Sequence, residues 1–120
     1  HYGCGGVRAA MSHQHLGLIN KWLRNIKDVY RLHSVELDSQ PDEEKRYNRL
    51  CELNVIEQVY HLAELSFVQL AWKREHRPIL HGWIYDLNTG LLKQTAMVDP
   101  AHLPHDIFVY DFPDDPQPPG

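Results

Sequence analysis

The sequence has 120 residues, 42% of them hydrophobic and 23% charged, which is the composition of a soluble globular domain and excludes a wholly disordered chain. Its 12 Lys and Arg residues are interspersed among 16 Asp and Glu residues, so no nucleic-acid surface is expected, because neutralising phosphates requires clustered positive charge. The sequence also lacks a run of about 18 apolar residues and a leader-like segment, and we expect neither a membrane span nor a secretory signal.

The first residues predict a turn that leads into a short helix. Gly3, Gly5 and Gly6 suit a tight turn in which the backbone closely approaches another group, and a helix is predicted over residues 7–11. A longer amphipathic helix is predicted over residues 16–37, because apolar side chains recur there at intervals of three and four. The side chains that set this spacing belong to Ile19, Trp22, Leu23, Ile26, Val29 and Tyr30.

A second long helix is predicted to follow, with Ser39 as its N-cap. Asp42 stands three residues further on and Pro41 falls in the first turn, as is common at helix starts. Apolar residues keep helical spacing as far as Ala63, and we predict a break near Glu64.

The next segment predicts a short helix and then a hairpin. From residue 66 the pattern is apolar nearly all round, which indicates a deeply packed helix that ends by His76 and is stopped by Pro78. Residues 79–85 are rich in β-branched and aromatic side chains and predict a strand. Turn-forming residues at 86–90 then lead into a second extended run over residues 91–98.

The composition changes at Asp99. Six of the eight prolines lie between residues 100 and 119, and residues 99–120 contain no Lys or Arg to balance their aspartates. Such a segment is a poor core former, so we divide the chain into a folded part, residues 1–98, and a tail, residues 99–120, that is dispensable for the fold.

These elements predict a helix-rich α/β fold that is incomplete. The helices have apolar faces on all sides, yet one hairpin is a marginal sheet on its own. We therefore expect an N-terminal segment outside this sequence, or another protomer, to complete the sheet. The first residue is His1 and not a methionine, which also suggests that the chain is part of a longer one.

The first four residues contain a candidate metal site. His1 and Cys4 stand three positions apart in a glycine-rich turn, and imidazole nitrogen and thiolate sulfur are donors that Zn²⁺ favours. Two ligands make only half a site, and Cys4 could instead be a small buried residue. Cys4 and Cys51 are too few to staple a small secreted fold, and unpaired thiols favour a reducing compartment, so a cytoplasmic location is expected.

The sequence His1-Tyr2-Gly3-Cys4-Gly5-Gly6-Val7 resembles the second zinc motif of the β-class carbonic anhydrases. Further stretches resemble the same family in the same order, so the likeness extends from residue 1 to about residue 93. They lie at residues 16–23, 51–59, 71–73, 81–85 and 90–92.

This resemblance implies a zinc lyase that interconverts carbon dioxide and bicarbonate, with a mostly parallel sheet and a dimeric or tetrameric assembly. The family's zinc has two cysteine ligands and one histidine ligand, and the bound metal activates water for attack on carbon dioxide. His1 and Cys4 match two of these ligands, and the backbone amide of Gly5 matches a group that holds substrate oxygens. Tyr85 matches a tyrosine of a non-catalytic bicarbonate pocket found in one subgroup.

The sequence also departs from the family pattern. The other family motif, Cys-x-Asp-x-Arg, carries a zinc cysteine and an Asp–Arg pair, and it is absent here. Cys51 does not replace that cysteine, because it lies in a predicted helix within a stretch that already matches another part of the family. We therefore expect the isolated chain to be inactive. The alternatives are a non-catalytic assembly module and a structural zinc site closed by ligands from a neighbouring protomer.

Other conspicuous residues are expected to be structural. Trp22, Trp72 and Trp83 have helical or strand spacing, which favours packing roles over a cofactor cleft. His81 lies on the predicted hairpin, where a structural hydrogen bond is favoured over a catalytic role.

Overall fold

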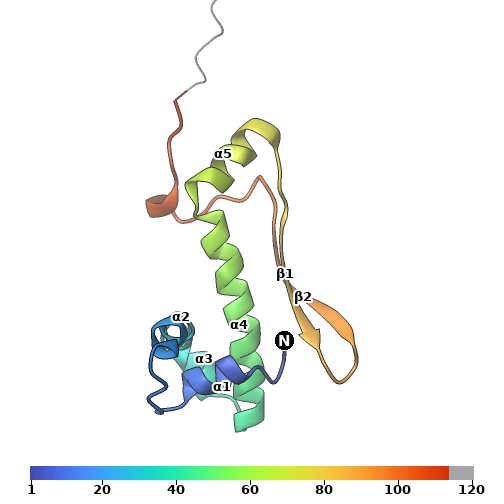
Figure 1. Ribbon diagram of the computed structural model, residues 1–120. Helices are drawn as coiled ribbons and strands as arrows, with labels where there is room; N and C mark the ends of the chain where they lie inside the picture. The colour runs from blue at the N-terminus through green and yellow to red at the C-terminus, as the bar shows by residue number, and fades with distance from the viewer. Residues whose placement is uncertain (114–120) are drawn as a thin grey trace, which may run out of the picture.

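The computed structural model describes residues 1–113 of the chain, which form five α-helices, a two-stranded antiparallel sheet and one 3₁₀ turn. Figure 1 shows α4 as a central rod, with α1, α2 and α3 around its first half, the hairpin along one side and α5 beyond its far end. The bounds are α1 Gly5–Met11, α2 Ile19–Leu32, α3 Ser34–Asp38, α4 Glu43–Ala63, α5 Ser66–Glu75, β1 Leu80–Asp86, β2 Leu91–Val98 and the 3₁₀ turn Asp106–Phe108.

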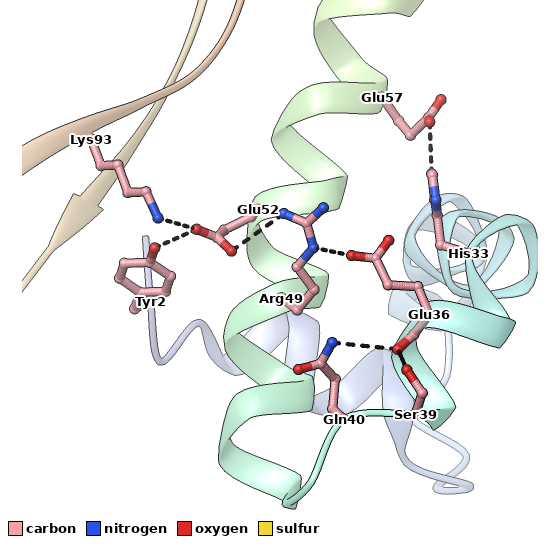
Figure 2. Close-up of polar contacts among 9 residues, drawn as sticks. All are labelled: Tyr2, His33, Glu36, Ser39, Gln40, Arg49, Glu52, Glu57 and Lys93. Atoms are coloured by element: carbon pink, nitrogen blue, oxygen red, sulfur yellow. Dashed lines mark hydrogen bonds and ion pairs between the residues drawn. The ribbon is translucent and has the colours of Figure 1, made fainter.

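The helix predicted over residues 16–37 is wrong as a single element, because the structure divides it into α2 and α3. The division falls at His33, whose φ of −112° and ψ of 23° are not helical. The ring Nε2 of His33 lies 2.8 Å from Oε1 of Glu57 on α4, so this tertiary contact is made where the helix breaks (Figure 2).

The predicted N-cap of α4 is also wrong. Asp42 caps this helix, with its carboxylate accepting a hydrogen bond of 2.8 Å from the backbone N–H of Lys45. The hydroxyl of Ser39 is used elsewhere, since it donates to the backbone carbonyl of Glu36 at 2.7 Å. The end of α4 at Ala63 agrees with the predicted break.

The predicted helix at residues 66–76 is present as α5, but it is buried on one face only. Val68, Gln69 and Trp72 are buried, whereas Phe67 is 68% exposed. His76 follows the helix with a left-handed φ of 54°, which ends it ahead of Pro78 as predicted.

The predicted hairpin is confirmed. β1 and β2 pair antiparallel from Leu80 opposite Val98 to Asp86 opposite Leu91, with an irregularity after Gly82. A Cβ at Gly82 would lie only 2.8 Å from a methyl of Val59, so the absent side chain lets β1 pack directly on α4. Within residues 1–113 these are the only two strands and they are antiparallel, so the described residues do not form the mostly parallel sheet that the sequence-based expectation included.

The buried side chains form two clusters joined by α4. The larger one gathers α1, α2, α3, the first half of α4 and Ile84 of β1. The smaller one contains residues from the end of α4, from α5, from the start of β1 and from the end of β2. Of the three tryptophans, Trp72 is buried as predicted, whereas Trp22 and Trp83 are 58% and 52% exposed. Across the described residues, no helix is both long and apolar enough to cross a membrane.

The tail, which the sequence analysis expects to be a poor core former and dispensable for the fold, contacts α4 and α5 in the structure. The side-chain amide of Gln69 donates to the backbone carbonyl of Phe108 at 2.9 Å and accepts from the backbone N–H of Tyr110 at 3.1 Å. The ring of His102 also stacks on Tyr60, with centroids 5.8 Å apart. The tail is therefore attached to α4 and α5 as far as it is described, and residues 114–120 lie outside the described part.

Because Gln69 is buried, its amide needs the partners that the tail supplies. Gln69→Leu, and separately deletion of residues 106–120, are each expected to lower the free energy of unfolding by about 1–3 kcal/mol. Thermal unfolding followed by circular dichroism measures this, with Gln58→Leu as control because Gln58 is exposed on α4. An unchanged melting temperature after deletion would restore the expectation that the tail is dispensable.

Candidate metal centre

Residues 1–4, here named the ligand loop, lie where β1 ends and α1 begins. The backbone N–H of Tyr2 donates to the carbonyl of Tyr85 near the end of β1, at 3.2 Å. Gly3 then adopts a left-handed φ of 72°, which glycine allows without strain, and this turns the chain toward α1. Cys4 is the extended residue directly before that helix, and its carbonyl accepts the hydrogen bond of Arg8. A strand end, a turn and a helix start therefore fix the course of the loop.

The two candidate ligands have properties that suit a zinc ion. His1 is exposed, and its Nδ1 lies 2.8 Å from the carbonyl oxygen of Tyr2. When Nδ1 carries the proton and donates it there, Nε2 keeps a free lone pair, which is the tautomer that a metal-binding histidine uses. Cys4 is half-buried and forms no disulfide. The loop thus offers one imidazole nitrogen and one free thiol, the donor set that zinc favours.

The part of the chain that the structure describes supplies no larger ligand set. Within residues 1–113, no three side chains of His, Cys, Asp or Glu gather closely enough to hold a metal ion. A catalytic zinc site uses about three protein ligands and keeps one open position. If the ligand loop binds zinc catalytically, the remaining ligand comes from outside the described residues.

Two further candidates lie beside the loop. Gly5 is the first residue of α1 and is exposed, so its backbone N–H belongs to the first turn, where N–H groups lack intrahelical partners. The carbonyl of Tyr85 holds Tyr2, whereas its side chain lies on the exposed face of β1 and is 41% exposed. A Cβ at Gly90 would lie 3.7 Å from the Tyr85 hydroxyl, which places that hydroxyl over the hairpin turn.

Cys51 lies in the core on α4, near Cys4, a neighbourhood that the sequence did not predict. It is 4% exposed, and burial raises the pKa of its thiol despite a hydrogen bond with the backbone of Cys4 that lowers it. The structure therefore gives Cys51 a packing role.

An ionic network fastens the ligand loop to the rest of the fold (Figure 2). The phenol of Tyr2 donates to Oε2 of Glu52 on α4 at 2.7 Å, and Nζ of Lys93 on β2 approaches the same oxygen at 2.8 Å. Arg49, one turn earlier on α4, lies 3.5 Å from the other oxygen of Glu52 and 2.5 Å from Glu36 on α3. Three elements, the ligand loop, β2 and α4, therefore meet at this carboxylate, and Arg49 links them to α3.

The surroundings of Glu52 keep its carboxylate charged at neutral pH. Burial raises the pKa of Glu52, but hydrogen bonds from Lys93 and Tyr2 outweigh it, so the pKa lies below its usual value. Burial raises the pKa of the Tyr2 phenol, and its hydrogen bond to Glu52 raises it further. Neither Tyr2 nor Glu52 was singled out from the sequence, because they are 50 positions apart and follow no local pattern.

His81 is not part of this neighbourhood. It is exposed on β1, four residues before Tyr85, and its ring lies 5.8 Å from that of Trp83 between centroids. This ring contact does not test the structural hydrogen bond expected for His81, which stays a prediction.

Comparison with known proteins identifies relatives over most of the chain. The family model described as "Carbonic anhydrase" matches residues 1–92. A carbonic anhydrase of Emericella nidulans is 52% identical over 103 residues, which are 86% of this chain and 45% of that protein. The chain therefore spans about half the length of this relative.

Solved structures show the same relationship. A β-carbonic anhydrase of Coccomyxa superposes with a TM-score of 0.76 at 27% identity, over 82% of this chain and 46% of that one. One of two tetrameric β-carbonic anhydrases of Sordaria macrospora gives 0.72 at 30% identity, over 78% and 48%. A β-carbonic anhydrase of Aspergillus fumigatus gives 0.71 at 35% identity, over 86% and 47%.

Proposed function

The chain belongs to the β-class carbonic anhydrase family, and we propose that it supplies the His-x-x-Cys half of a catalytic zinc site for the reversible hydration of carbon dioxide. The observation that carries this proposal is the ligand loop, which holds an imidazole and a free thiol between a strand end and a helix start. The rest of the site, including the third protein ligand, comes from a segment or protomer outside these 120 residues.

The residues of this chain have distinct roles in the proposed site. His1 binds the metal through Nε2 while its Nδ1 is held by the carbonyl of Tyr2, and Cys4 binds it through sulfur. Zinc, when bound, would act as a Lewis acid that lowers the pKa of water toward neutrality. The backbone N–H of Gly5 donates a hydrogen bond to an oxygen of carbon dioxide or bicarbonate, which orients the substrate beside the loop.

The hairpin supports the expectation that further strands complete the sheet. One edge of β1 pairs with β2, and its other edge is held near its end by Tyr2. A strand that led into the ligand loop along that edge would run parallel to β1. The exposed face of the hairpin also carries Trp83 and Leu92, which a covering layer would bury. We propose that an N-terminal segment or another protomer supplies this strand and this cover.

The assembled protein is proposed to be a cytoplasmic homo-oligomer. Two β-carbonic anhydrases of Sordaria macrospora are described as tetrameric. In this chain the apolar side chains of Trp22 on α2 and of Leu18, directly before α2, are exposed and provide surface for association. The free thiols of Cys4 and Cys51 are consistent with a reducing compartment.

A second candidate function is a non-catalytic module that retains the fold and binds zinc structurally, if at all. The observation that favours it is the absence, within residues 1–113, of a third metal-binding side chain near the loop. A structural site would have four protein ligands and no open position.

A stopped-flow assay of carbon dioxide hydration separates the two functions. The chain is purified together with a segment that bears the Cys-x-Asp-x-Arg motif, and its zinc content and intact mass are measured. The catalytic proposal expects zinc-dependent turnover by this assembly. Stoichiometric zinc without turnover would identify the structural module instead.

Tyr85→Phe tests regulation by bicarbonate in the same assembly. If the Tyr85 hydroxyl helps to form a non-catalytic bicarbonate pocket, the variant should lose most of the inhibition by bicarbonate while its turnover without added bicarbonate is unchanged. The measurement is the initial rate against bicarbonate concentration at fixed pH. An identical inhibition curve in the variant would show that Tyr85 has no part in regulation.

A further inference from the structure

The ligand loop is anchored through Tyr2, the residue directly after His1. Its backbone N–H is bound to Tyr85 of β1 at 3.2 Å, and its phenol is bound to Glu52 of α4 at 2.7 Å. The next positions are open, since a Cβ at Gly3 or Gly5 would meet no atom within 4 Å. Tyr2 is therefore bound to the rest of the fold through both its backbone and its side chain.

Glu52 is itself held in place from several sides, as an anchor must be. Its side chain is 13% exposed, and Lys93 of β2 binds the same carboxylate oxygen that accepts from Tyr2. Arg49 holds the second oxygen and is fixed in turn by Glu36 (Figure 2). A carboxylate with this many charged partners has little rotational freedom, so the position of the Tyr2 phenol is well defined.

From this geometry we propose that Glu52 is a positioning residue for the metal centre: it fixes Tyr2, and through Tyr2 the directions in which His1 and Cys4 present their donor atoms. Glu52 contacts neither ligand directly, so its effect is indirect. The inference rests on the proposed zinc function of the ligand loop. Groups that hydrogen-bond directly to metal ligands typically change metal affinity by about 10- to 100-fold when they are replaced, so we expect the indirect effect of Glu52 at the lower end of that range.

Two variants remove the anchor while keeping the shape of the side chain. Tyr2→Phe deletes the hydroxyl alone, and Glu52→Gln replaces the carboxylate by a neutral amide. Tyr47→Phe is the matched control, because the Tyr47 hydroxyl also donates to a carboxylate, Glu43 at 2.9 Å, but lies outside the ligand loop. All are compared with the wild-type protein, and with the Tyr2→Phe/Glu52→Gln double variant, in the same assembled state.

Zinc affinity is measured by competition with a chromogenic chelator, and the absorption spectrum of the Co²⁺-substituted protein reports ligand geometry. Tyr2→Phe is expected to weaken zinc binding by about 10-fold and to alter the cobalt spectrum. The double variant should be no weaker than the weaker single one, because both changes break one contact. Tyr47→Phe should bind as the wild type does. Amide hydrogen exchange of residues 2–4 in the metal-free protein should be faster in Tyr2→Phe and in Glu52→Gln, and unchanged in Tyr47→Phe.

The possible results distinguish this inference from the function on which it rests. Wild-type zinc affinity and an unchanged cobalt spectrum in both Tyr2→Phe and Glu52→Gln would overturn the positioning role and leave the zinc function intact. A wild-type protein that binds no zinc would overturn the proposed function and this inference with it. If Glu52→Gln does not fold, Tyr2→Phe alone decides between the first two results.

Discussion

Replacing Cys4 by serine is expected to abolish stoichiometric zinc binding. Serine has nearly the same size as cysteine, but its hydroxyl is far less acidic than a thiol and is a poor ligand for zinc. The described residues provide no other free thiol at the loop surface, since Cys51 is buried with a raised pKa. Loss of a direct ligand should cost more than the roughly 10- to 100-fold that loss of an outer partner costs.

Elemental analysis of the purified variant, normalised to protein, checks this result. Cys51→Ala is the matched control, because it removes the other cysteine, deep in the core, and should retain zinc while losing about 1–2 kcal/mol of stability. Unchanged zinc in Cys4→Ser would remove the chemical basis of the proposed site. Loss of zinc in a folded Cys51→Ala variant would show that the buried cysteine is a ligand.

The chain by itself is expected to have no appreciable carbon dioxide hydration activity. The reason is the number of ligands: a catalytic zinc site of this type needs about three protein ligands and an open position, and the ligand loop offers His1 and Cys4. The aspartate and arginine that accompany the third ligand in the family motif are also absent from the sequence. A metal ion held by two residues alone would therefore lack the groups that orient its water.

A stopped-flow pH-indicator assay on the purified chain, verified by mass to contain residues 1–120 alone, measures this prediction. The expected trace matches the uncatalysed rate with or without added zinc. Addition of a segment with the Cys-x-Asp-x-Arg motif should restore turnover, and it should also reduce aggregation by covering the exposed face of the hairpin. Zinc-dependent turnover by the chain alone, abolished by Cys4→Ser, would show that the site is completed in another way.

Elements specified by local signals could be predicted from the sequence. The end of α4 at Ala63, the stop of α5 before Pro78 and the hairpin around residues 86–90 all follow from spacing, proline and turn residues. The break at His33 could not be predicted, because it coincides with a contact to Glu57, 24 positions away. The N-cap of α4 was misassigned because Ser39 and Asp42 are both capping residues, and only the structure shows that Ser39 binds Glu36 instead.

The candidate site was predictable only in part for the same reason. His1 and Cys4 are three positions apart in the sequence, so their spacing alone indicates a candidate metal site. Glu52 contacts the ligand loop from 50 positions away, and no local pattern in the sequence indicates that contact. The attachment of the tail to Gln69 likewise depends on backbone groups 39 and 41 positions distant, which composition alone does not predict.

We propose that His1 and Cys4 bind the zinc of a catalytic site that is completed from outside this chain. A crystal structure of the zinc-loaded assembly, with anomalous diffraction recorded at the zinc edge, tests it most directly. We predict one anomalous peak at about 2.0–2.1 Å from Nε2 of His1 and about 2.3 Å from the sulfur of Cys4, with a third ligand from outside the chain and one open position. A peak elsewhere, or a zinc ion closed by four protein ligands, would contradict this account.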